Sequence, residues 1–411
     1  MKVNAVIAEY NPFHNGHKYH LDASVQKTSA DYTIIVMSGN FVQRGAPAIA
    51  EKYLRARAAL LNGADLVIEL PVFYAASSAE YFATGAVTLI DKLGVVDALC
   101  FGSECGEISV LNRIAQILLN EPEEYRAYLK NYMRLGHSYP ISRTNALIQY
   151  DPSLSDWRNV LSTPNNILGI EYIKALSRRK SSIIPTTTIR AGSDYHDIRM
   201  GKNQSSANAI RVALSSGQDM DFLHGQMPDS AFEILKKGLS EIPMMISDDF
   251  SESLYYKLLN EKNTGYTKYF DVSPSLSDRI LKHIYEYKSF SEFCNILKSK
   301  DMTYTRISRC LLHILLDMTN ESFEECKALG YTPYARVLGF KNASSPLLSS
   351  IKKNSEIPLI TKLADAKAVL SDGAFRMLEN ELRMNNIYLS AAALKSGTNL
   401  KNELSTPIVI V

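Results

Sequence analysis

Cysteine is scarce in this sequence, and its positions exclude a disulfide framework. Five cysteines are scattered over 411 residues. The only close pair, Cys100 and Cys105, has the spacing of neither a zinc knuckle nor a redox Cys-x-x-Cys motif. Clustered carboxylates that would mark a dedicated metal site are lacking too. We therefore expect reduced, mostly buried cysteines and predict no metal-binding residue.

Long apolar runs and an excess of charge of one sign are likewise missing. No apolar run approaches the ~20 residues needed to cross a bilayer, and the N-terminal segment lacks the charged leader and apolar core of a signal peptide. We expect a cytoplasmic protein without a membrane partner. The net charge of +2 is nearly neutral, so composition alone does not indicate a nucleic-acid binder, and any RNA contact must come from local basic patches.

What the sequence does contain is an alternation of apolar runs and helical patterns. Runs that are apolar throughout predict buried strands, whereas the segments between them have helical spacing. This alternation indicates a parallel sheet covered by helices on both faces, so the predicted fold is a doubly wound, Rossmann-like α/β domain. The predicted strands are 3–8, 32–37, 66–70, 98–102 and 183–190.

Two other regions differ from this alternation. Residues from about 108 to 160 are helical and polar, and we interpret them as an insertion into the sheet domain. Beyond Gly217 glycine thins while leucine, tyrosine, lysine and serine rise. We therefore divide the chain into residues 1–217 and a mostly helical region, 218–411, with helices at 252–260, 275–287, 290–298 and 305–318 and a strand at 334–339.

The first strand leads into the stretch with the clearest chemistry. A helix begins near His17, and His14 lies in the loop just before it. A helix start attracts phosphate through its free N–H groups and dipole, and Gly16 lets the backbone approach closely. Two imidazoles there can donate hydrogen bonds to a phosphate under attack, which suits nucleotidyl transfer. The short His-x-Gly-His motif also fits a strand–loop–helix with two surface histidines.

The residues around this motif carry a family resemblance. Glu-Tyr-Asn-Pro-Phe-His-Asn-Gly-His at 9–17 resembles the signature of the bacterial tRNA(Met) cytidine acetate ligases, a branch of the HIGH-motif nucleotidyltransferase superfamily. Further blocks are similar to that family and follow in its order: MSGNFVQRG at 37–45, ADLVIELP at 64–71, FGSE at 101–104, PNNILG at 164–169 and SDYHD at 193–197. Residues 205–211 resemble the Ile-Ser-Ser-Thr-x-Ile-Arg block of small nucleotidyltransferases, with Asn208 where threonine is more common.

The resemblance implies an ATP-dependent, RNA-modifying ligase. Acetate would be activated as acetyl-adenylate, and the acetyl group would pass to N4 of the wobble cytidine of elongator tRNA(Met). ATP is the implied cofactor, with Mg²⁺ accompanying it. Residues 1–217 would then form a nucleotidyltransferase-like, ATP-binding domain, and residues 218–411 a possible tRNA-binding region. The sequence does not indicate an oligomeric state.

The expected site combines these motifs. His14 and His17 would be catalytic, Arg211 would hold the leaving phosphates, and Gly102, Asn165 and Arg190 would border the adenosine. The loop after the second strand, Ser38 and Gly39, is the expected acetate pocket because it ends at the same sheet edge. The full ATP-binding set is Ile7, Ala8, Glu9, Tyr10, Asn11, Pro12, Phe13, His14, Asn15, Gly16, His17, Lys18, Tyr19, His20, Gly102, Asn165, Arg190, Ser206 and Arg211.

RNA contacts are predicted from local positive charge. Lys52, Arg55 and Arg57 lie on a helix beside the expected site, although an ordinary amphipathic helix is an equal alternative. Arg306, Arg309 and Lys282 with two nearby tyrosines form a second basic surface, for which simple solvation is the more common explanation.

Two other functions remain open from the sequence. A cofactor-pathway adenylyltransferase would share the sheet and the histidine motif but would not need the long C-terminal region. A non-catalytic RNA-binding protein could retain a relic nucleotide pocket. Labelled acetate distinguishes the three, since only the ligase transfers it to RNA.

Overall fold

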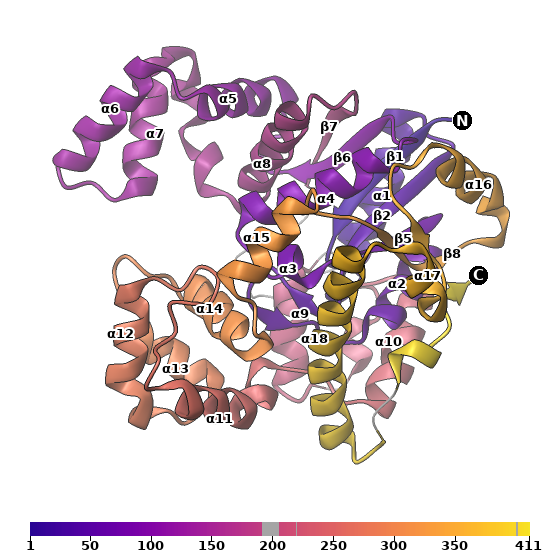
Figure 1. Cartoon of the computed structure of the whole chain (residues 1–411). Coiled ribbons are helices and arrows are strands. Elements are labelled where there is room, and N and C mark those ends of the chain that lie inside the picture. The colour runs from indigo at the N-terminus through magenta and orange to yellow at the C-terminus, as the bar shows by residue number, and fades with distance from the viewer. Residues whose placement is uncertain (191–204, 219, 400–401) are drawn as a thin grey trace.

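The chain is built around one eight-stranded, mostly parallel sheet (Figure 1). The computed structural model describes residues 1–190, 205–218, 220–399 and 402–411, so the SDYHD block at 193–197 lies outside the described residues. The strand order is β10-β8-β5-β2-β1-β6-β7, with β9 paired to β8. The strands are β1 (Val3–Ala8), β2 (Tyr32–Ser38), β5 (Leu66–Leu70), β6 (Ala98–Ser103), β7 (Ile184–Ile189), β8 (Ala335–Phe340), β9 (Leu359–Ile360) and β10 (Val409–Ile410).

The central strands form a doubly wound sheet, as predicted. β5, β2, β1, β6 and β7 are all parallel to one another. The chain moves outward from β1 through β2 to β5 and then returns to the other side of β1 with β6. Strand order therefore reverses between β1 and β6, and ligands bind at such a switch point beyond the carboxyl ends of the strands.

Helices cover both faces of the sheet, which explains why its strands are apolar throughout. Adjacent residues point to opposite faces, so Ile34 packs into one core and Ile35 into the other. Helices α4 (Ala79–Lys92) and α8 (Pro164–Arg179) cover the first face; α1 (Asn15–Thr28), α2 (Lys52–Leu61), α9 (Ala207–Ser215) and α10 (Asp229–Glu241) contribute to the second core.

The segment between β6 and α8 is helical, as expected for an insertion. It extends from the sheet at the upper left of Figure 1. Its elements are α5 (Ile108–Asn120), α6 (Glu123–Arg134), α7 (Tyr139–Tyr150) and the 3₁₀ segment η1 (Pro152–Ser162). Within the described residues, no helix combines the length and apolarity needed to cross a bilayer.

The C-terminal region is mostly helical, but it does not form a unit separate from the sheet. β8 pairs antiparallel with β5, and β10 pairs with β8. The predicted boundary at residue 217 is therefore wrong for the sheet, because strands from beyond residue 334 complete it. The helices of this region are α11 (Ser251–Glu261), α12 (Pro274–His283), α13 (Phe290–Leu297), α14 (Tyr304–Leu316), α15 (Asn320–Ala328), α16 (Ser345–Asn354), α17 (Ala366–Val369) and α18 (Asp372–Ser396). β3 (Phe41–Val42) and β4 (Ala46–Pro47) pair as a separate two-stranded sheet, and the short helix α3 (Val72–Ala75) follows β5.

Candidate active site

A cavity of about 400 Å³ opens at the switch point of the sheet. It lies beyond the ends of β1 and β6 and is lined by residues of the loop after β1, by the start of α1, and by the ends of β6 and β7. Residues of α8, α9 and α14 close its other sides. A cavity of this size, lined by both apolar and polar groups, is typical of a small-molecule or cofactor site.

The loop after β1 is held by aromatic packing. Tyr10 has a φ of +47° and is buried, and its ring packs 4.9 Å from the rings of both Phe13 and His17. Phe13 is itself 5.7 Å from the His17 ring. Tyr10 and Phe13 therefore form an apolar support that fixes the imidazole of His17 at the cavity wall.

The hydrogen bonds of His14 and His17 show which ring nitrogen carries the proton. His14 caps α1: its Nδ1 accepts from the backbone N–H of Gly16 at 3.0 Å. The Nδ1 of His17 accepts from the backbone N–H of His14 at 3.3 Å. In a neutral ring whose Nδ1 is an acceptor, Nε2 carries the proton. Both rings line the cavity as Nε2–H donors, stacked with centroids 3.8 Å apart.

Burial keeps these imidazoles neutral. Desolvation, followed by the positive charges of Arg190 and Arg211, lowers the pKa of His14 to about 3. Desolvation and the neighbouring His14 also hold the pKa of His17 well below its ordinary value. At neutral pH both rings are therefore hydrogen-bond donors rather than fixed cations.

Gly16 is required by this arrangement. A Cβ at residue 16 would lie 2.8 Å from Cε1 of His14. Real Cβ contacts are essentially never that short, so a side chain here would displace the capping imidazole. The glycine of the motif therefore makes room for the histidine ring as well as for a ligand.

The opposite wall is held by an interlock between the loop after β6 and the start of α8. The Glu104 carboxylate accepts hydrogen bonds from the side chain of Asn165 at 2.6 Å and from the backbone N–H of Asn166 at 2.8 Å. Asn166 Oδ1 accepts in return from the Glu104 N–H at 3.0 Å. These contacts join the FGSE and PNNILG blocks and place Asn165 at the cavity.

Two arginines bring positive charge to the cavity. The backbone N–H of Arg190 donates to Ser103 O at 3.0 Å, which extends β7 beside Gly102. Ser206 caps α9 by accepting from the Ala209 N–H at 3.1 Å. Further along α9, the Arg211 guanidinium donates to Asn11 O at 2.7 Å. Arg190 and Arg211 line the cavity, where they can neutralise a polyphosphate.

Most residues predicted to bind ATP come together at this cavity. Those that line it are Ile7, Ala8, Glu9, Tyr10, Asn11, His14, Gly16, His17, Tyr19, His20, Gly102, Asn165, Arg190, Ser206 and Arg211. Pro12, Phe13, Asn15 and Lys18 do not. Asn15 instead donates to Gly225 O at 2.7 Å, and Lys18 forms an ion pair with Asp22 on α1.

The expected acetate pocket at Ser38 and Gly39 is not supported by the structure. Both residues are buried, and neither lines the cavity. Their carbonyl oxygens accept hydrogen bonds from the Arg55 guanidinium. A Cβ at residue 39 would overlap the Glu69 carboxylate. The glycine therefore makes room for a buried charge, not for a substrate.

The predicted RNA contacts of Lys52 and Arg55 are also wrong. Their side chains are 1% and 3% exposed, respectively. Arg55 binds backbone carbonyls of the loops after β1 and β2, including Glu9 O at 2.6 Å. Both charged groups therefore bind partners inside the protein. Arg57, on the same helix, is exposed, and its contact with RNA stays a prediction.

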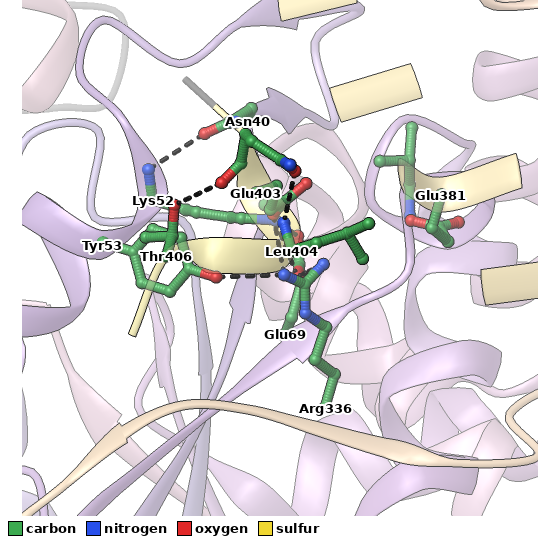
Figure 2. Close-up of polar contacts among 12 residues, drawn as sticks. Asn40, Lys52, Tyr53, Glu69, Arg336, Glu381, Glu403, Leu404 and Thr406 are labelled. Carbon is green, nitrogen blue, oxygen red and sulfur yellow. Dashed lines mark hydrogen bonds and ion pairs between the residues drawn. The ribbon is translucent and has the colours of Figure 1, made fainter. Parts of the chain in front are cut away.

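Lys52 belongs to a buried cluster of two cations and two carboxylates (Figure 2). Lys52 Nζ lies 2.8 Å from Glu69 Oε1 and also pairs with Glu403. Arg336 lies 3.1 Å from Glu69 Oε2 and 2.8 Å from Glu403 Oε1. Burial opposes the charge of Lys52, as does Arg336, but the carboxylates of Glu403 and Glu69 raise its pKa above the ordinary value. The cluster joins α2 and β5 to β8 and the C-terminal segment.

The sequence prediction missed the wall that the C-terminal region adds to the cavity. Thr305 and Arg309 of α14 line it, as do Gln43 and Arg44 of the β3–β4 hairpin. Arg309 was considered only as part of an RNA-facing surface. The hairpin and α14 are locked together: Gly45 has a φ of +74°, and Ser308 Oγ donates to Gly45 O at 2.8 Å. Gly45, in the MSGNFVQRG block, was the one local signal of this contact.

Within the part of the chain that the structure describes, no magnesium site is built from protein side chains. Among the described residues, no three or more His, Cys, Asp or Glu side chains are grouped as a metal site would need. Glu9 is the only carboxylate among the described residues that line the cavity. These residues do not fit a dedicated Mg²⁺ site.

The fold and the cavity together define a nucleotidyltransferase of the HIGH type. The family model described as "HIGH Nucleotidyl Transferase" matches residues 1–403. A tRNA(Met) cytidine acetate ligase of Acetivibrio thermocellus is 40% identical over 418 residues, with 100% of both chains covered. One of Thermoanaerobacter sp. (strain X514) is 42% identical over 392 residues, covering 95% of this chain and 96% of the relative.

Solved structures agree with these relatives. The crystal structure of apo Thermotoga maritima TmcAL matches with a TM-score of 0.93 at 31% identity, covering 100% of both chains. The structure of the same protein bound with alpha-thio ATP matches with a TM-score of 0.88 at 31% identity, again over 100% of both chains. The chain therefore belongs to the tRNA(Met) cytidine acetate ligase family of HIGH nucleotidyl transferases.

Proposed function

We propose that this protein is an ATP-dependent ligase that activates acetate as acetyl-adenylate and transfers the acetyl group to N4 of the wobble cytidine of elongator tRNA(Met). The observation that carries the proposal is the pair of Nε2–H donors, His14 and His17, fixed by backbone N–H groups at the start of α1. The names of the relatives and the alpha-thio ATP bound to the Thermotoga maritima protein support the same reaction. The site of action is the cytoplasm, where ATP and tRNA occur.

The first half-reaction is displacement at the α-phosphate of ATP. An acetate oxygen attacks the α-phosphorus, and pyrophosphate leaves with the bonding electrons. His14 and His17 donate hydrogen bonds to the non-bridging oxygens, whose charge is stabilised further by the start of α1. Arg211 and Arg190 balance the charge of the leaving phosphates, and Gly102 and Asn165 border the adenosine. Mg²⁺ would accompany the ATP, bound to its phosphates and water.

The reaction is tested with labelled acetate. Purified protein, ATP and tRNA should yield acid-precipitable label in RNA, whereas label in a small adenylylated product would indicate an adenylyltransferase and no turnover a non-catalytic protein. His17→Ala should abolish acetate-dependent ATP–pyrophosphate exchange without loss of the folded state by circular dichroism. Near-normal exchange by this variant would refute the role of the histidine pair.

A further inference from the structure

A second, smaller cavity shares a wall with the ATP cavity. Its volume is about 220 Å³, and four residues line both cavities: Glu9, Asn11, Arg44 and Arg211. The rest of its lining is mostly apolar and comes from the β3–β4 hairpin, from α9 and from residues 244–247. The two cavities therefore adjoin, and an acyl group bound on the ATP side would lie next to a group bound on the other side.

The mouth of this second cavity carries exposed apolar side chains. Val212 of α9 is 44% exposed and Ile246 is 40% exposed, and both line the cavity with Met244 and Pro47. Apolar edges around a small cavity are suited to a flat ring that has been taken out of a base stack. The volume accommodates a single ring and excludes a paired helix.

Glu9 is placed between the two cavities and is rigidly held. Its backbone carbonyl accepts from Arg55 at 2.6 Å, and its Oε1 accepts from the Gln43 N–H at 2.9 Å. Throughout the described parts of the chain, no hydrogen-bond donor reaches its Oε2. A carboxylate oxygen is the group that recognises the exocyclic amine of cytosine.

The geometry points to the second cavity as the acceptor-base subsite, in which the cytosine ring lies against Pro47 and Met244 and Glu9 accepts a proton from its N4 amine. This inference rests on the proposed function. The N4 lone pair forms a bond to the carbonyl carbon of acetyl-adenylate, and the carbon–oxygen bond to the phosphate breaks. AMP leaves with the electron pair, and the N4 proton moves to Glu9 Oε2.

The subsite is tested by filling it without altering the ATP cavity. Val212 lines the second cavity only, and its exposure lets it accept a larger side chain. Val212→Trp should retain acetate-dependent ATP–pyrophosphate exchange while transfer of labelled acetate to tRNA falls at least tenfold. Val369→Trp is the matched control, since Val369 is 54% exposed and lines neither cavity, and it should retain both activities.

Glu9 is tested by the ratio of the two half-reactions. Glu9→Gln should lower acetyl transfer by about 10²–10⁴, the contribution of general base catalysis, and the loss should exceed any loss of exchange at least tenfold.

The results that would contradict the subsite, the role of Glu9 and the proposed function differ from one another. Unchanged transfer by Val212→Trp, or an equal loss of both activities, would overturn the subsite. An equal loss in Glu9→Gln would assign Glu9 to the ATP step, and a raised Mg²⁺ requirement for exchange would make it a metal ligand; either refutes its role as base. Absence of RNA label with the wild-type protein would instead refute the proposed function itself.

Discussion

Replacing Lys52 by methionine should destabilise the protein strongly without changing how it binds RNA. The ammonium group lies 2.8 Å from Glu69 Oε1 and pairs with Glu403, and 1% of the side chain is exposed. Methionine fills much of the same volume but leaves two buried carboxylates facing Arg336 alone. Removal of one partner from a buried ion pair costs about 3–5 kcal/mol. We expect the free energy of unfolding to fall by that amount.

Urea unfolding measures this effect. The midpoint should move to lower urea with an unchanged slope, because the change alters stability and not the surface exposed on unfolding. Arg57→Met is the matched control: it lies exposed on the same helix and should change the free energy of unfolding by less than about 0.5 kcal/mol. Adding Glu403→Gln to Lys52→Met should cost less than the sum of the single changes, since the two groups interact directly.

Two outcomes would refute this reasoning. Equal stability of Lys52→Met and Arg57→Met would show that the cluster contributes little. A reduced salt dependence of tRNA binding in Lys52→Met, with stability unchanged, would show that the ammonium group faces RNA after all.

Three further predictions concern other parts of the molecule. Burial raises the pKa of Glu381 from 4.5 to about 8, so the unfolded chain loses this proton at a lower pH than the folded protein does. The free energy of unfolding should therefore fall by about 1.4 kcal/mol per pH unit between pH 4.5 and 8. In urea titrations, Glu381→Gln should remove this pH dependence, whereas the exposed Glu379→Gln should not. Gly45→Ala, whose Cβ would overlap the backbone of Arg309, should cost more stability than Gly136→Ala, which has a φ of +84° but nothing within 4 Å, and only the former should weaken ATP binding in calorimetry. His14→Asn should lower the maximal rate of pyrophosphate exchange by about 10²–10³ because the shorter amide side chain cannot place an N–H where Nε2–H of His14 lies; an unchanged rate would exclude that donor.

The sequence predicted those features that depend on neighbouring residues. Strands apolar on both faces require helices on both sides, so the existence of β1, β2, β5 and β6 and the placement of His14 and His17 at the loop and helix start after β1 followed from local pattern alone. Contacts between residues that are far apart in the sequence were not predictable in this way. Lys52 has the spacing of a surface lysine on an amphipathic helix, and only its meeting with Glu403, from the far end of the chain, shows that it is buried.

The same reasoning explains the other corrections. Gly39 was assigned to the acetate pocket because its loop ends at the sheet edge where ligands bind, and the sequence does not show that the carboxylate of Glu69 lies beside it. Arg309 reaches the cavity because α14 docks on Gly45, a contact between residues far apart in the chain. The side chains whose contacts depend on long-range packing lie elsewhere than the sequence suggested, whereas His14 and His17, which a loop and a helix start position, line the cavity.

β8 and Glu403 are synthesised late because they lie near the C-terminal end of the chain, and this has a consequence for folding during biosynthesis. Because a ribosome makes the N-terminal segment first, Lys52 and Glu69 are synthesised long before Arg336 and Glu403 exist to complete their charge balance. The edge of β5 also stays unpaired until residues 335–340 emerge. The nascent nucleotide-binding half therefore matures only after translation has nearly finished, and a prematurely terminated polypeptide retains an open sheet edge that proteases and chaperones can recognise.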